Sequence, residues 1–166
     1  MKCKIVKLDQ FSGDEASVYS IYLDKAKSTL FEEFMKENII SFKSELIDIV
    51  KRLKVIGSKT GARGDFFKFN EGDLSDGICA LYDEPDSKLR LYCIRYGNDI
   101  IILGGGGEKP KNIKAFQENE KLEKENYLLR EISKEITKRI KNKDITRSEN
   151  YLDFEGELEF DTAEYE

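Results

Sequence analysis

The most constraining feature of the sequence is a series of strand-like segments between residues 66 and 103. Aromatic and β-branched residues alternate there with turn-forming Gly, Asp, Asn and Pro, which is typical of consecutive antiparallel strands. The clearest strand covers residues 88–96, and Gly97-Asn98 predicts a tight reversal into the apolar run 100–103. A continuous apolar run fits a central strand covered on both faces. The pattern predicts an antiparallel meander with strands at 66–69, 78–82, 88–96 and 100–103.

Helical patterns precede and follow this meander. Apolar residues recur at helical spacing in residues 30–35 and 40–56, and two such helices need a shared surface to cover. A third, long helix is predicted from about residue 112 to residue 143, and strand-like segments at 2–8 and 17–23 start the chain. We therefore expect an α+β fold in which two N-terminal helices pack on an antiparallel β-meander, followed by a long C-terminal helix.

Charge is unevenly distributed along the 166 residues, whose formal net charge is −5. Residues 144–166 contain nine acidic residues and one basic residue, whereas residues 1–143 contain 27 basic and 24 acidic residues. We expect one domain over 1–143 and an acidic segment over 144–166. Apolar residues alternate with acids in that segment, which fits a hairpin, an edge strand or a tail lying over the protein's own basic face. They are Leu152, Phe154, Leu158 and Phe160.

The composition excludes several kinds of chemistry. The chain has no histidine, so Ser-His and Cys-His nucleophilic catalysis and histidine-ligated metal sites are excluded. The cysteines Cys3, Cys79 and Cys93 are dispersed among apolar neighbours, which indicates reduced, buried thiols. No apolar run has transmembrane length, and the first residues lack a signal-peptide pattern. We expect a cytoplasmic protein with no metal, no cofactor and no membrane contact.

Four consecutive glycines, Gly104 to Gly107, follow the apolar run. They match neither a Walker A motif nor GxGxxG. We interpret them as a flexible exit from the strand. A second interpretation is a backbone that an anion can approach closely, with Lys109 and Lys111 just beyond.

Strand periodicity separates two sets of side chains on residues 88–96. One face carries Leu89, Leu91 and Cys93, which suit packing against the helices, while the other carries a cation and two rings. On the preceding strand, Phe67 and Phe69 are expected to pack inward, leaving Lys68 on the open face. Cations beside aromatic rings suit a single nucleic-acid strand, although a solvated sheet face carries the same residues without that function. The residues of the open face are Lys68, Arg90, Tyr92 and Tyr96.

The order strand, helix, helix, meander resembles the RelE/ParE superfamily of bacterial toxins, in particular its HigB-like, phage Gp49-like branch. The resemblance covers about residues 63 to 117. It rests on Leu89-Arg90-Leu91-Tyr92, the apolar run 100–103, the glycine-rich turn and Lys109-Pro110-Lys111.

This resemblance implies an mRNA endonuclease that acts on the ribosome and is inhibited by a separate antitoxin protein of the helix-turn-helix type. In such enzymes the RNA 2′-hydroxyl attacks the adjacent phosphate, basic residues stabilise the developing charge, and another group protonates the departing oxygen. By position, the catalytic residues would be Arg90, Lys68 and Tyr92. The RNA-binding residues would be Arg63, Tyr96, Lys109 and Lys111.

One departure from the family leaves a second hypothesis open. Many relatives carry a catalytic tyrosine or histidine near the C-terminal end, where this chain has Asn112 and Ile113. The alternative is therefore a non-catalytic protein- or RNA-binding protein on the same fold.

Overall fold

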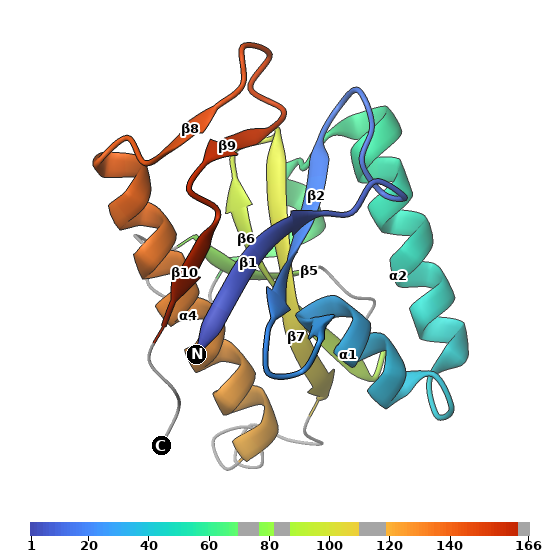
Figure 1. The fold of residues 1–166 in the computed structure, drawn as a ribbon. Helices are drawn as coiled ribbons and strands as arrows, with labels where there is room; N and C mark the ends of the chain where they lie inside the picture. The colour runs from blue at the N-terminus through green and yellow to red at the C-terminus, as the bar shows by residue number, and fades with distance from the viewer. Residues whose placement is uncertain (70–76, 82–86, 110–118, 163–166) are drawn as a thin grey trace.

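A computed structural model describes residues 1–69, 77–81, 87–109 and 119–162 of the chain (Figure 1). Two strands come first, β1 (Lys2–Lys7) and β2 (Ser17–Leu23), followed by the short β3 (Ser28–Thr29). The strands predicted at 2–8 and 17–23 are therefore present, so the chain starts with strands and not with the two helices named as N-terminal in the expected fold. Both strands have apolar residues that face the core, and they pair antiparallel with Ile5 opposite Ile21.

Two helices then follow β3. Helix α1 (Leu30–Asn38) starts where the Thr29 side chain accepts a hydrogen bond from the Glu32 backbone N–H, which satisfies one of the free donors of the first turn. Helix α2 (Lys43–Val55) continues into a π-helical turn, η1 (Ile56–Thr60), and a 3₁₀ turn, η2 (Gly64–Phe66), leads into the next strand. The two helices predicted from the apolar spacing are therefore present.

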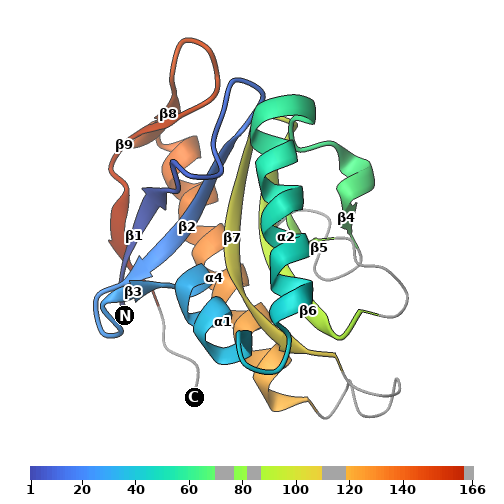
Figure 2. The same ribbon diagram turned by 90° about the vertical axis from the view of Figure 1, so that its right-hand side faces the viewer.

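The predicted meander is present as β4 (Phe67–Lys68), β5 (Ile78–Leu81), β6 (Leu89–Tyr96) and β7 (Ile100–Glu108). These strands belong to a sheet with the order β10-β1-β2-β7-β6-β5-β4, in which β3 also pairs with β2. The sheet is mostly antiparallel, but β2 and β7 are parallel, with Ser17 opposite Ile100. The N-terminal strands thus join the meander through its last strand (Figure 2).

Helices cover both faces of this sheet. Helices α1 and α2 lie on one face and α4 (Glu120–Lys141) lies on the other (Figures 1 and 2). Strand β7 accordingly divides two apolar cores, because Ile101 and Leu103 pack toward α1 and α2 while Ile100 and Ile102 pack toward α4. All four side chains are fully buried, as expected for a central strand. The expectation of an open face on the meander is wrong, since α4 covers it.

The acidic segment forms three short strands, β8 (Ile145–Arg147), β9 (Phe154–Gly156) and β10 (Glu159–Asp161). Strands β8 and β9 pair as a separate two-stranded sheet, and β10 pairs antiparallel with β1 at the edge of the main sheet. The segment therefore contains both a hairpin and an edge strand. Within the described residues, no helix is long and apolar enough to cross a membrane.

Candidate nucleic-acid interface

Two of the predicted cations lie on neighbouring parts of the face that α4 covers. Lys68 of β4 is opposite Ala80 of β5, which is opposite Tyr92 of β6. Arg90 precedes Tyr92 by two residues, so both project from the same face of the strand. Because adjacent strands are about 4.8 Å apart, the backbones of Lys68 and Tyr92 are separated by about 10 Å. Lys68 and Arg90 therefore lie on the same face of the meander, on strands that are separated by β5.

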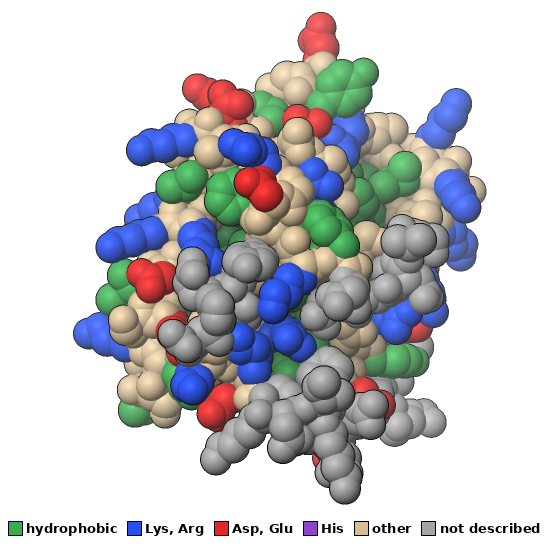
Figure 3. All heavy atoms as spheres, turned by 180° about the vertical axis from the view of Figure 1, so that it is seen from behind, with side chains coloured by type: hydrophobic (Ala, Val, Ile, Leu, Met, Phe, Trp, Pro, Cys, Tyr) green, Lys and Arg blue, Asp and Glu red, His purple; other side chains and the backbone are tan. Residues whose placement is uncertain are grey.

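A third cation adjoins the same region. The Lys109 backbone N–H donates to the Lys88 carbonyl oxygen at 2.7 Å, and Lys109 Nζ donates to Ser87 Oγ at 3.2 Å. This places Lys109 beside the start of β6, just beyond the pairing of Arg90 with Gly107. On the side of the molecule opposite that of Figure 1, Lys and Arg side chains gather in the middle of the surface (Figure 3). Lys111 lies outside the described residues.

The two predicted tyrosines are part of the core. Tyr92 is 1% exposed and belongs to the apolar cluster that includes Leu129 and Ile132 of α4. The ring of Tyr96 packs edge-to-face on Phe154, with centroids 5.1 Å apart. Burial raises the pKa of the Tyr96 phenol, and nearby Arg147 only partly opposes this effect. Tyr92 therefore presents no surface on which a base can stack, and Tyr96 is partly buried against the same cluster.

An aromatic ring that the sequence placed in the core is instead exposed. Phe69 is 47% exposed, because β4 ends at Lys68 and the chain no longer follows the sheet at residue 69. Arg95 of β6 lies with its guanidinium carbon 5.6 Å from the centre of the Phe69 ring. Arg63 lies just before η2, exposed and 3.4 Å from the Asp65 carboxylate. The turn-forming Asn70-Glu71-Gly72 after Phe69 is the sequence signal that the strand ends there.

The glycine run is not a loop, because β7 continues through Gly107. All four glycines are buried, and α4 lies close to this part of the strand. A Cβ atom at Gly104 would lie 2.7 Å from Leu129 Cδ2, and one at Gly105 would lie 2.2 Å from Glu125 Oε2. The glycines therefore allow close packing of α4 on the sheet, and their interpretation as a flexible exit is wrong.

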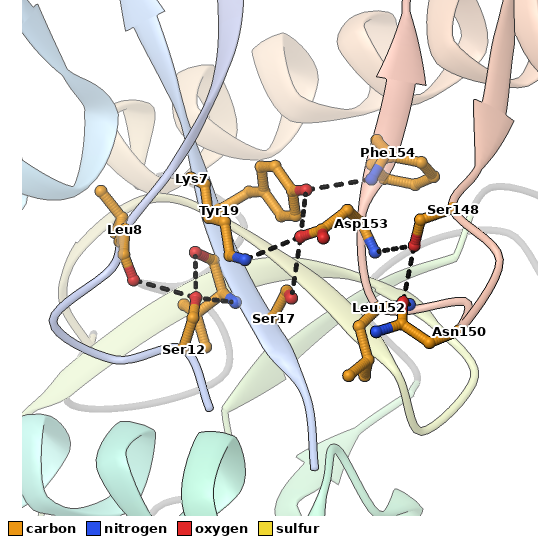
Figure 4. A network of polar contacts seen from close by, with 11 residues as sticks. Lys7, Leu8, Ser12, Ser17, Tyr19, Ser148, Asn150, Leu152, Asp153 and Phe154 are labelled. Atoms are coloured by element: carbon orange, nitrogen blue, oxygen red, sulfur yellow. Dashed lines mark hydrogen bonds and ion pairs between the residues drawn. The ribbon is translucent and has the colours of Figure 1, made fainter. Parts of the chain in front are cut away.

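Polar contacts hold the C-terminal segment on the first two strands (Figure 4). The Asp153 carboxylate accepts a hydrogen bond from Lys7 Nζ at 2.7 Å, and longer ones from Ser17 Oγ and Tyr19 OH at 3.5 Å. Tyr19 OH in turn accepts from the Phe154 backbone N–H at 3.0 Å. The hydrogen bond with Asp153 raises the pKa of Lys7, and burial raises the pKa of Tyr19.

The acidic segment packs at two places on the main sheet. Strand β10 pairs with β1 at the end of the strand order opposite β4, which carries Lys68. The β8–β9 hairpin packs beside the end of β6, where Phe154 contacts Tyr96. Acids of the segment form ion pairs with Lys4, Lys7 and Arg139.

Among the described residues, no three Cys, Asp or Glu side chains are grouped so that they could hold a metal ion. No protein-family model, no curated protein and no solved structure matches this chain.

Proposed function

We propose that this protein is a RelE/HigB-like toxin, an endonuclease that cleaves mRNA and is held inactive by a separately encoded antitoxin protein. The observation that carries the proposal is the placement of Arg90 and Lys68 on one face of the meander, with Lys109 beside the start of β6. The sequence of α1, α2 and the meander β4 to β7 supports it, because the family resemblance rests on two helices followed by a meander; here three strands, β1 to β3, precede the helices. We further propose that it acts in the cytoplasm on ribosome-bound mRNA.

The chemistry assigned to this site is charge stabilisation. Attack of the RNA 2′-oxygen on the neighbouring phosphate forms one P–O bond, breaks the bond to the 5′-oxygen, and concentrates negative charge on the phosphoryl oxygens. The Arg90 guanidinium can donate two parallel hydrogen bonds to those oxygens, and Lys68 and Lys109 add positive charge nearby. Cations held in place before the reaction lower its barrier, because they need no rearrangement as charge develops.

The mechanism also needs a group that transfers protons. Tyr92 was expected to serve here, but its side chain is 1% exposed, so a nucleotide reaches its hydroxyl only if α4 moves. The proposal therefore relies on the cations, and Tyr92 keeps its place as a core residue beside Arg90.

Two observations favour a non-catalytic alternative, in which the same fold binds RNA or a protein partner. The chain contains no histidine, and Tyr92 and Tyr96 both lie in the core. An RNA-binding protein needs cations and an accessible ring but no group that transfers protons. A neighbouring reading frame that encodes a small helix-turn-helix protein would favour the toxin.

Induced expression in a bacterial host tests the proposal, with growth and the integrity of transcripts as readouts. We expect growth arrest and transcript cleavage with the wild type, and loss of both with Arg90→Ala or Lys68→Ala. Arg90→Lys keeps the charge but removes the paired hydrogen bonds, so cleavage should fall by about 100-fold in rate.

The matched control is Lys124→Ala. Lys124 lies on the exposed side of α4, where it contacts Glu120 at 3.4 Å. This variant should remain as toxic as the wild type. Intact transcripts and normal growth with well-expressed wild-type protein would refute the nuclease, and RNA binding without cleavage would select the alternative.

A further inference from the structure

The exposed ring of Phe69 has an unusual setting at the β4 edge of the sheet. One side of the ring faces the Arg95 guanidinium, whose carbon is 5.6 Å from the ring centre. Phe67 lies beside it, with ring centroids 6.3 Å apart and planes tilted by 57°. A Cβ atom built on Gly64 would be 3.9 Å from the ring edge, so η2 lies close to the ring. The ring is therefore supported by its neighbours and is still 47% exposed.

Hydrogen bonds hold the side chain of Arg95, which contacts the Phe69 ring. Arg95 Nε donates to the Ala62 carbonyl oxygen at 2.8 Å, and its NH2 group donates to Asn98 Oδ1 at 2.6 Å. These two bonds hold the guanidinium in one orientation. A ring supported in this way loses little conformational freedom when a ligand stacks on it, which favours binding.

An exposed cation lies near the ring. Arg63 precedes Gly64, on which a built Cβ atom would lie 3.9 Å from the edge of the Phe69 ring. Arg63 is exposed and lies 3.4 Å from the Asp65 carboxylate, which is also exposed, so a phosphate can compete for it. An exposed ring with an exposed cation near it suits a single nucleic-acid strand, in which bases alternate with phosphates.

We propose that Phe69 is a stacking platform for an unpaired base, with Arg63 contacting an adjacent phosphate. The ligand class is single-stranded RNA, and the inference rests on the proposed function for that choice. The stacking role expected of Tyr92 and Tyr96 thus passes to a ring at the sheet edge.

The test is RNA binding by the full-length chain, measured by fluorescence anisotropy. The probe is a labelled 12-nucleotide RNA with 2′-O-methyl groups, which cannot supply the attacking hydroxyl. Phe69→Leu keeps an apolar side chain of similar size but removes the ring, so we expect binding to weaken by about 5-fold to 100-fold. An oligonucleotide with abasic sites keeps the phosphates, and we expect it to bind wild type and Phe69→Leu equally.

Phe69→Trp gives a second readout, because the chain contains no tryptophan. The Phe69→Trp variant should bind the RNA at least as tightly as the wild-type protein does. The stacked base should quench the fluorescence of the introduced indole. The matched control is Tyr151→Trp, which places an indole at a residue 63% exposed in the C-terminal segment. RNA should leave the fluorescence of this control unchanged.

The outcomes separate this inference from the proposed function. If the wild type binds RNA and Phe69→Leu binds it equally well, the stacking platform is refuted while the proposed function stands. Equal quenching of both indoles would also refute it. If the wild type binds no RNA, the platform is refuted, while growth arrest and transcript cleavage on induced expression decide the proposed function separately.

Discussion

Gly106 has the least room for a side chain in the glycine run. A Cβ atom there would lie 1.9 Å from the Arg90 carbonyl oxygen, which is backbone and cannot rotate away. At the neighbouring Gly107 the nearest atom would be Lys121 Cγ at 3.4 Å, in a flexible side chain. We therefore expect Gly106→Ala to lower the free energy of unfolding by about 2–3 kcal/mol, because β6 and β7 must separate locally.

The matched variant is Gly107→Ala, which should change the free energy of unfolding by less than about 0.5 kcal/mol. Urea unfolding followed by circular dichroism measures both. Equal effects of the two substitutions would show that the glycines are interchangeable and that the Arg90 carbonyl does not set the requirement.

Strand β6 shows how far the sequence predicts an element and its surroundings. Its period-2 alternation correctly separated Leu91 and Cys93 from Tyr92, because pleating depends only on the local backbone. What covers each face depends on distant parts of the chain, and the sequence analysis missed that α4 packs on the Tyr92 side. A signal was present, since Ile94 and Ile78 also project from that face and a solvated face would rarely carry them.

The sequence predicts some residues of the candidate site and not others, because some positions depend on local periodicity and others on distant pairing partners. Pairing of β4 with β5 and of β5 with β6 puts Lys68 and Arg90 on one face, which follows from the predicted meander and its periodicity. The position of Phe69 depends on where β4 ends, and strand ends are set by pairing partners as much as by local residues. The alternation predicted an inward ring, while the structure ends the strand one residue earlier.

A substitution in strand β10 tests whether the acidic segment is part of the fold. Phe160 is 5% exposed, lies opposite Cys3 of β1, and has the Arg139 guanidinium carbon 5.4 Å from its ring centre. We expect Phe160→Ala to lower the free energy of unfolding by about 3 kcal/mol, because it leaves a cavity between β10 and α4. Thermal and urea unfolding measure this change.

The control on the same strand is Glu159→Ala. Glu159 contacts Lys4 at 3.7 Å, and both side chains are more than half exposed, so the loss should be below about 0.5 kcal/mol. If Phe160→Ala is as mild as this control, the segment is a dispensable tail rather than a strand of the sheet.

At the scale of the whole molecule, the net charge of −5 combines two regions with different positions. Strand β10 of the acidic segment is at the β1 edge and Asp153 contacts Lys7, whereas the candidate cations are on β4 and β6. Exposed charges are screened beyond roughly 10 Å at 0.1 M salt, so the net charge of the whole chain does not describe the field at one surface. The overall charge therefore does not argue against RNA binding on β4 and β6.

The fold also raises the pKa values of a set of groups that titrate in alkaline solution. Burial is the main cause for the thiols and phenols, and it raises the pKa of Cys3 from 9.0 to about 11. For Lys121, burial acts in the opposite direction, but the contacts with Glu125 and Glu37 outweigh it. The groups with raised pKa values are Cys3, Lys7, Tyr19, Cys93, Tyr96 and Lys121.

All of these shifts make stability fall at high pH. A raised pKa means that the folded protein keeps a proton that the unfolded chain has already released, so the free energy of unfolding decreases as pH rises. For Cys3, the stability is fully present below pH 9.0 and is lost as pH rises toward about 11. Urea midpoints measured from pH 7 to pH 10.5 should therefore fall.

Tyr96→Phe and Cys93→Ala should flatten the fall, because each removes a buried titrating group. Tyr151→Phe, at an exposed ring, should not change the slope, and an unchanged slope in all three variants would contradict the assignment.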